Sequence, residues 1–252
     1  MKRFITSKNI AYFIGVLLLL FLWTILSFVI DERTLILPDP FVTIKETIML
    51  LGKSFTYKCI ASSLIRLFIG FVISLFFAII FGVIAGNNKF IKNLFTPFIS
   101  SIKSIPTAAL VFLFLVILGA RNTPIVMVIF VAFPILYEAL VGGIENMDQD
   151  VIKAMKLEST SKIRNVLLVQ LPLVMPYLLV GIASSFSLSF KIEIMSEILT
   201  GDTRLGLGSA ILSFQKTDPI NMVPIFSYSL IVIILSLIFT GIINLLKKKF
   251  SI

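Results

Sequence analysis

Residues 148–176 read DQDVIKAMKLESTSKIRNVLLVQLPLVMP, a short polar segment that leads into an apolar one with two prolines. Asp148 and Asp150 are placed to cap a helix and to favour the positive end of its dipole. One face of that helix would carry a small apolar stripe, made of Val151, Ile152 and Met155. Ser159-Thr160-Ser161 then offers hydroxyls that can cap a second helix. This pattern predicts two short helices that meet at a corner just before a long apolar helix.

Long apolar stretches dominate the rest of the chain. Of its 252 residues, 58% are hydrophobic and 14% are charged, whereas a soluble domain carries about 25% charged residues. A helix of about 20 apolar residues crosses the hydrocarbon core of a bilayer. Six stretches approach that length: Ile10–Ile30, Leu67–Ala85, Leu94–Leu118, Thr123–Gly142, Val166–Phe190 and Met222–Leu246. The sequence therefore predicts an all-α integral membrane protein with six transmembrane helices and a short cytoplasmic helix between spans four and five.

The distribution of cations predicts the orientation of these spans. Residues 1–8 hold three cations, and Lys247–Lys249 supply three more after the last span. Because cations that flank membrane helices are retained in the cytoplasm, we expect both termini and the 148–165 loop to be cytoplasmic. The first apolar run is longer than a signal-peptide core and has no small-residue cleavage site, so it is expected to stay as an N-terminal span within residues 1–36.

Residues 37–59 are expected to lie outside the membrane core. They open with Leu37-Pro38-Asp39-Pro40 and continue with apolar residues at near-helical spacing: Val42, Ile44, Ile48 and Leu51. This pattern predicts an amphipathic helix in the outer membrane interface, with a plain external linker as the alternative. No internal repeat or soluble-domain linker interrupts the chain, so residues 1–252 are expected to form one membrane domain with its core at 60–246.

Several chemistries are excluded by what the chain lacks. It has no histidine, which excludes histidine-based triads and zinc proteases, and its one cysteine, Cys59, cannot form an intramolecular disulfide. Gly52-Lys53-Ser54 ends like a phosphate-binding loop, but Thr47 stands where that loop needs its first glycine. The net charge of +9 comes from cations at helix ends, so nucleic acid is not an expected partner. We expect no catalytic, metal or cofactor site in this chain.

Polar residues inside the apolar spans are candidates for the lining of a solute pathway. A charged side chain costs about 2.5–3.5 kcal/mol at the centre of a membrane helix, so it favours a functional or a paired role. The candidates lie on the predicted third and fifth spans: Ser100, Ser101, Lys103, Ser104, Thr107, Ser184, Ser185, Ser187 and Glu197. Hydrogen bonding between helices is the alternative for the serines, and snorkelling is the alternative for Lys103 and Glu138. The Gly82-x-x-x-Gly86 pair fits close packing within the chain or contact with a second copy.

Residues 148–176 resemble the cytoplasmic loop by which bacterial ABC-importer permeases bind their ATPase. In that family the loop carries Glu-Ala-Ala, three residues, Gly, nine residues, an aliphatic residue, any residue and Leu-Pro. The same spacing here gives Lys153-Ala154-Met155, Ser159, Val169 and Leu171-Pro172. Lys153 and Ser159 depart from the family's Glu and Gly. Further matches follow in the family's order, at Ser62–Phe71, Ile102–Pro106 and Glu197–Leu199 before Gly206-Leu207-Gly208. The Leu-Pro-x-Pro segment at residues 37–40 resembles the Pro-Ser-Pro segment that precedes the permease domain in one branch of this family. That branch transports nitrate, sulfonates, taurine and bicarbonate.

The resemblance implies a permease subunit of the bacterial plasma membrane that works by alternating access. Its partners would be a second permease copy, ATPase subunits that hold ATP and Mg²⁺, and an extracytoplasmic solute-binding protein. Coupling to the ATPase would fall to Asp150, Val151, Ile152, Lys153, Ala154, Met155, Leu157, Ser159, Leu171 and Pro172; we refer to residues 148–172 as the coupling segment. The branch implies a small anion as the solute. A thiamine-precursor-like solute and a gradient-driven carrier are the alternatives.

Overall fold

The chain folds into helices throughout the part that the structure describes. The computed structural model describes residues 2–30, 37–157, 162–201 and 205–250. In order along the chain, the elements are α1 (Lys2–Ile30), α2 (Pro40–Leu51), α3 (Ser54–Asn87), α4 (Lys89–Ser104), α5 (Thr107–Glu145), α6 (Gln149–Leu157), α7 (Lys162–Asn165), the π-helical turn η1 (Val166–Gln170), α8 (Leu171–Thr200), α9 (Leu207–Thr217) and α10 (Val223–Phe250).

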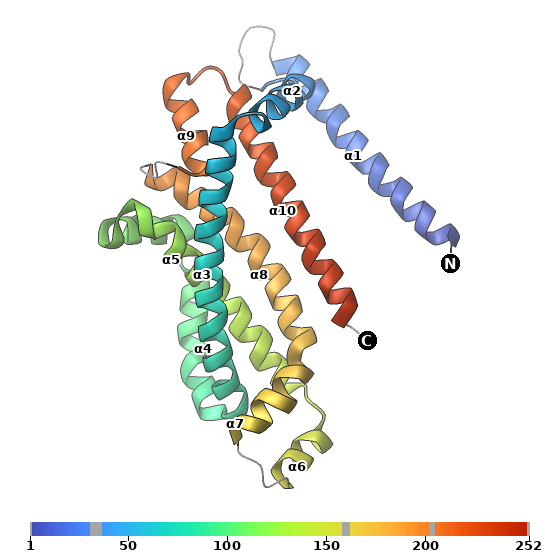
Figure 1. Ribbon diagram of the computed structural model, residues 1–252, viewed down its shortest axis with the longest axis vertical. Helices are drawn as coiled ribbons and strands as arrows, with labels where there is room; N and C mark the ends of the chain where they lie inside the picture. The colour runs from blue at the N-terminus through green and yellow to red at the C-terminus, as the bar shows by residue number, and fades with distance from the viewer. Residues whose placement is uncertain (1, 31–36, 158–161, 202–204, 251–252) are drawn as a thin grey trace.

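Three long helices, α3, α5 and α8, form the core of the bundle (Figure 1). Glycines allow them to approach closely. A Cβ atom added at Gly82 of α3 would lie 2.9 Å from the Cβ of Leu140 in α5, and one added at Gly181 of α8 would lie 2.6 Å from the Cβ of Ala139 in α5. Both distances are shorter than carbon atoms tolerate. The Gly82-x-x-x-Gly86 pair therefore packs within the chain, against α5.

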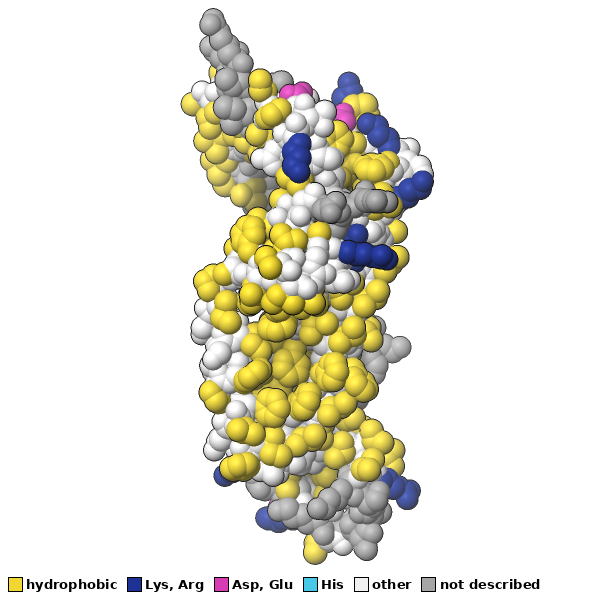
Figure 2. All heavy atoms as spheres, turned by 90° about the vertical axis from the view of Figure 1, so that its left-hand side faces the viewer, with side chains coloured by type: hydrophobic (Ala, Val, Ile, Leu, Met, Phe, Trp, Pro, Cys, Tyr) yellow, Lys and Arg dark blue, Asp and Glu magenta, His cyan; other side chains and the backbone are white. Residues whose placement is uncertain are grey.

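The apolar helices are suited to a membrane. Among the described residues, four helical segments are long and apolar enough to cross one: α3, α5, α8 with the turn before it, and α10. The apolar part of α1, Ile14–Ile30, is shorter. Figure 2 shows hydrophobic side chains over the middle of one face, with Lys and Arg above and below them. The prediction of an all-helical, multi-pass membrane protein is confirmed.

The predicted third span, Leu94–Leu118, is wrong as a single helix. α4 ends at Ser104, and Ile105 and Pro106 separate it from α5 with extended backbone angles. The reason is that a proline disfavours helical angles in the residue before it. α5 is then bent at Gly119, whose φ of 74° and ψ of 166° belong to a region that is open almost only to glycine. The chain therefore enters the long part of α5 through two short helical pieces.

The two ends of the bundle carry different short helices. α2 and α9 lie at one end and α6 at the other, and both α1 and α10 point their terminal ends towards the end with α6 (Figure 1). α2 is capped by the carboxylate of Asp39, which accepts a hydrogen bond from the Phe41 N–H at 2.7 Å. Its threonines face α10, where the Ser227 hydroxyl donates to the Thr43 carbonyl at 3.2 Å. Most of its apolar side chains face outwards, including Ile48, which is 66% exposed, whereas Leu50 is buried in the core. The expected helix is present, and its place in the membrane interface remains a prediction.

Candidate coupling and pathway sites

α6 presents one face to the bundle and another to the outside. The helix is capped by Asp148, whose carboxylate accepts the Asp150 N–H at 2.9 Å. The apolar stripe turns inwards, because the side chains that pack against the core are Val151, Ile152 and Met155. The outward face is formed by Asp150, Lys153, Ala154 and Leu157. Asp150 and Lys153 form an ion pair at 3.0 Å, and Leu157 is 87% exposed. The stripe thus anchors α6 to its own chain, and the outward face is exposed. Ser159 lies outside the described residues.

The residues that lead from α6 into α8 form a widened helical turn. The Asn165 side-chain amide donates to the Met155 carbonyl at 3.1 Å, which ties the end of α6 to α7. Pro172 has no backbone N–H, so a regular helix would leave a carbonyl unpaired in the preceding turn. That turn is η1, where the Leu171 N–H reaches back to the Val166 carbonyl in the π-helical pattern. Leu171 and Pro172 of the coupling segment thus lie where the helix changes from the π-helical geometry of η1 to the α-helical geometry of α8.

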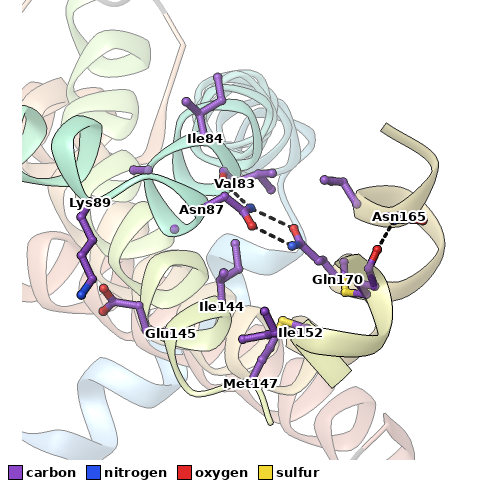
Figure 3. Close-up of a pocket in the computed structure, with 14 residues that line it drawn as sticks. Val83, Ile84, Asn87, Lys89, Ile144, Glu145, Met147, Ile152, Asn165 and Gln170 are labelled. Carbon is purple, nitrogen blue, oxygen red and sulfur yellow. Dashed lines mark hydrogen bonds between the residues drawn. The ribbon is translucent and has the colours of Figure 1, made fainter. Parts of the chain in front are cut away.

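A polar link joins η1 to the end of α3. Gln170, the last residue of η1, donates its amide to the Asn87 side-chain oxygen at 2.8 Å and accepts from the Asn87 amide at 2.9 Å (Figure 3). Beside this pair is a cavity of about 890 Å³, bounded by residues of α3, α5, α6, α7 and η1. Sequence reasoning missed both amides, because two polar residues 83 positions apart carry no pattern that relates them.

The pathway candidates on α4 form an exposed polar surface. Four of them lie in its last turns: Ser100, Ser101, Lys103 and Ser104. The Lys103 ammonium contacts the Glu138 carboxylate of α5 at 2.8 Å, and both side chains are about half exposed. This ion pair between α4 and α5 is the paired role expected for a charged side chain in a span, and snorkelling stays a prediction. Thr107, at the start of α5, is half-buried.

The candidates on α8 divide between surface and interior. Ser184 is exposed. Ser185 is fully buried and donates to the Gly181 carbonyl of its own helix at 2.6 Å. The Ser187 hydroxyl is 2.8 Å from that of Thr240 in α10, which is the helix-to-helix hydrogen bond expected as the alternative. Of these three serines, Ser184 is the exposed one, Ser187 is half-buried and Ser185 is buried.

Glu197 is the centre of a buried polar cluster that joins α3, α8 and α9. Its carboxylate pairs with the Arg66 guanidinium and accepts from the Ser63 hydroxyl at 2.9 Å and from the Gly208 N–H at 2.8 Å. The Ser63 hydroxyl in turn accepts the Leu207 N–H at 2.9 Å. Glu197 is fully buried, so it cannot line a path that is open in this conformation. The sequence matches around Ser63, Glu197 and Gly208 were separate signals, and the structure brings them into one site.

Comparison with known proteins agrees with this architecture. Residues 78–252 match the family described as binding-protein-dependent transport system inner membrane component. The chain belongs to this family. It is 26% identical to the nitrate import permease protein NrtB of Synechocystis sp., over 97% of this chain and 87% of that protein. It is 24% identical to the taurine transport system permease protein TauC of Escherichia coli, over 86% and 82%.

Other relatives widen the comparison. This transport component is 26% identical to the bicarbonate transport system permease protein CmpB of Synechococcus elongatus, over 79% of this chain and 68% of that protein. Its fold is similar to a chain of the MetNI methionine ABC transporter in an inward-facing conformation, with a TM-score of 0.61 and 17% identity over 81% of this chain and 98% of that one. The expected resemblance to the nitrate, taurine and bicarbonate permeases is confirmed.

Proposed function

We propose that this chain is the permease subunit of an ABC importer for a small anion of the nitrate, taurine or bicarbonate kind. Family membership makes it a membrane component of a binding-protein-dependent transport system. The observation that carries the coupling role is α6, a short helix at the end of the bundle that anchors itself through an apolar stripe and turns Ala154 and Leu157 outwards. The solute class rests on the relatives, since the charge of Lys103 is balanced by Glu138.

The proposed assembly contains two permease copies, two ATPase subunits with ATP and Mg²⁺, and a solute-binding protein on the outer side. Closure of the ATPases would displace α6, and the permease would then open its pathway to the opposite side of the membrane. The exposed polar surface around Lys103 and Ser100 supports α4 as one wall of that pathway. Ser184 is the exposed candidate on α8.

We propose six membrane crossings, of which the third is broken. α4 has 16 residues and spans about 24 Å, less than the roughly 30 Å of hydrocarbon. α4 and residues 107–118 together would make one crossing, which is followed by the part of α5 after Gly119. α1 would add the crossing that precedes α3. This arrangement would put both termini on the side of α6, and the cations of residues 1–8 support a cytoplasmic location for that side.

Ala154→Arg tests the coupling role. Ala154 is small and outward-facing, so an arginine there would overpack a groove that receives α6. Overpacking typically costs about 1–3 kcal/mol, and about 1.4 kcal/mol changes affinity tenfold. With one such contact in each of two copies, we expect the variant to insert normally but to lose co-purifying ATPase and ATP-dependent uptake.

Asn146→Arg is the matched control. It adds the same side chain at an exposed position just after α5, outside α6, and should retain the ATPase. Full ATPase retention and normal uptake by Ala154→Arg would contradict the coupling role of α6. Uptake by the purified chain without any ATPase would support the gradient-driven alternative instead.

A further inference from the structure

We propose that Asn87 and Gln170 form an amide clamp that ties the end of α3 to the coupling segment, so that the two move together during transport. Both are positioning residues, because they act on α3 and the coupling segment and not on the solute. The inference deepens the proposed function and rests on it, since it takes α6 as the element that an ATPase displaces.

The clamp consists of two hydrogen bonds that run in opposite directions. Gln170 donates to Asn87 at 2.8 Å, and Asn87 donates to Gln170 at 2.9 Å. The same Asn87 amide nitrogen also donates to the Val83 carbonyl of α3, at 2.9 Å. Each side chain thus uses both a donor and an acceptor of its planar amide. Two antiparallel bonds fix the distance and the relative orientation of the partners, which a single bond would not do.

The widened turn η1 aims Gln170 at α3. The π-helical geometry before Pro172 adds room for one more residue per turn and rotates the side chains that precede it. Gln170 is 7% exposed, so its amide depends on a protein partner for its hydrogen bonds. A buried amide without such a partner is costly. Loss of the Asn87 amide would therefore break both hydrogen bonds between α3 and η1. It would also leave the Gln170 amide without this partner, so that Gln170 could move away from its position.

A chain of contacts leads from α6 to the clamp. The Asn165 amide holds the Met155 carbonyl of α6, and η1 follows directly after Asn165 and ends at Gln170. The cavity of about 890 Å³ is lined by Ile152 and Met155 of α6 and by Val83 of α3, and Figure 3 shows Ile152 and Val83 on different sides of the Asn87–Gln170 pair. Side chains transmit a displacement only where they are in contact. Because the cavity lies between α6 and α3 in this region, the clamp is the direct side-chain link there through which a movement of the coupling segment can reach α3, beside the indirect path through α5.

The clamp is tested by breaking it and by exchanging its partners. Asn87→Leu and Gln170→Leu each remove both hydrogen bonds, whereas the double variant Asn87→Gln with Gln170→Asn restores two amides of the same combined length. Each variant is purified with its ATPase and binding protein and placed in lipid vesicles. Nitrate and taurine serve as probe solutes, and the measured quantity is the number of ATP molecules hydrolysed per solute taken up.

We expect each leucine variant to keep its ATPase but to raise the ATP consumed per solute on the order of tenfold, as two hydrogen bonds are lost. The exchanged pair should return to within about twofold of the unmodified protein. Asn146→Leu is the matched control, because Asn146 donates only locally, to the Gly142 carbonyl of the helix that it follows, and its loss should leave the ratio unchanged. A second measurement uses spin labels at the exposed positions Lys89 and Ile163, which lie outside α6, with Cys59 replaced by serine. Their distance distribution should broaden in Asn87→Leu and narrow again in the exchanged pair.

Three results would overturn the clamp: an unchanged ATP ratio in the leucine variants, release of the ATPase by them, or no recovery in the exchanged pair. Each of these leaves ATP-dependent uptake by the unmodified complex intact. Failure of the proposed function would show differently, as an unmodified chain that neither holds an ATPase nor couples uptake to ATP.

Discussion

The buried ion pair between Arg66 and Glu197 should dominate the stability of the bundle end that carries α9. Arg66→Met removes the guanidinium while keeping most of the length of the side chain. The Glu197 carboxylate, whose side chain is completely buried, would then keep two donors, the Ser63 hydroxyl and the Gly208 N–H, but lose its cationic partner. Arg66 also donates to the Leu205 carbonyl at 2.7 Å, so the link to the residues before α9 is weakened too.

The expected loss is large because the charge that remains is buried. Removing one partner of a buried ion pair typically costs about 3–5 kcal/mol. In a chain of this size 1 kcal/mol lowers the midpoint of thermal unfolding by about 2–4 °C, so the expected shift is roughly 6–20 °C. The double variant Arg66→Met with Glu197→Gln removes both charges and keeps an oxygen that can accept from Ser63 and Gly208. It should therefore recover most of the loss.

The assay is thermal unfolding of the purified protein in detergent. The measured quantity is the fraction of protein that remains monodisperse after heating. Lys103→Met is the matched control, since the Lys103 and Glu138 side chains are 49% and 48% exposed. Exposed pairs contribute about 0–1 kcal/mol, so this variant should shift the midpoint by a few degrees at most. The reasoning is refuted if Arg66→Met unfolds within about 2 °C of the unmodified protein, or if the double variant is as unstable as the single one.

Two further predictions concern the backbone and the orientation. Gly119→Ala should destabilise the protein by about 1–3 kcal/mol, because φ of 74° with ψ of 166° is strained for a residue with a Cβ; an unchanged unfolding midpoint would show that α5 does not need this bend. Ser251→Cys, with Cys59 replaced by serine, should resist an impermeant thiol reagent in intact cells and react after lysis; labelling of intact cells would reverse the proposed orientation.

Four helical segments long and apolar enough to cross a membrane could be predicted, because each depends on a local property, the length of an apolar run. The break inside the predicted third span depends on a local property too. Ile105-Pro106 and Gly119 are the residues that interrupt it, and a count of apolar residues gave their backbone preferences too little weight. The break in the third span can therefore be predicted from the sequence when the backbone preferences of these residues are considered together with the length of the apolar run.

The two faces of α6 illustrate a different limit. Its amphipathic pattern predicts a helix with an apolar side, and the helix is present. The pattern does not say what covers that side, and Val151, Ile152 and Met155 proved to pack against their own bundle. The same holds for the α8 serines, whose spacing along one helix does not reveal which neighbour each of them meets. Pairings such as Ser187 with Thr240 depend on how distant helices are placed.

The contacts of α3 and α8 constrain how this permease can move. Near the end with α9 the two helices are joined by the Arg66 to Glu197 pair, and near the end with α6 Asn87 of α3 is joined to Gln170 of η1, the turn that leads into α8. Between these points α5 packs against both at glycines where an added Cβ atom would find no room. A unit held at both ends and closely packed in the middle moves as one body. Alternating access would then displace this three-helix body against α4 and against a second copy, instead of rocking its helices separately. The amide clamp fits this scheme, because it makes α3 follow a force that is applied at α6.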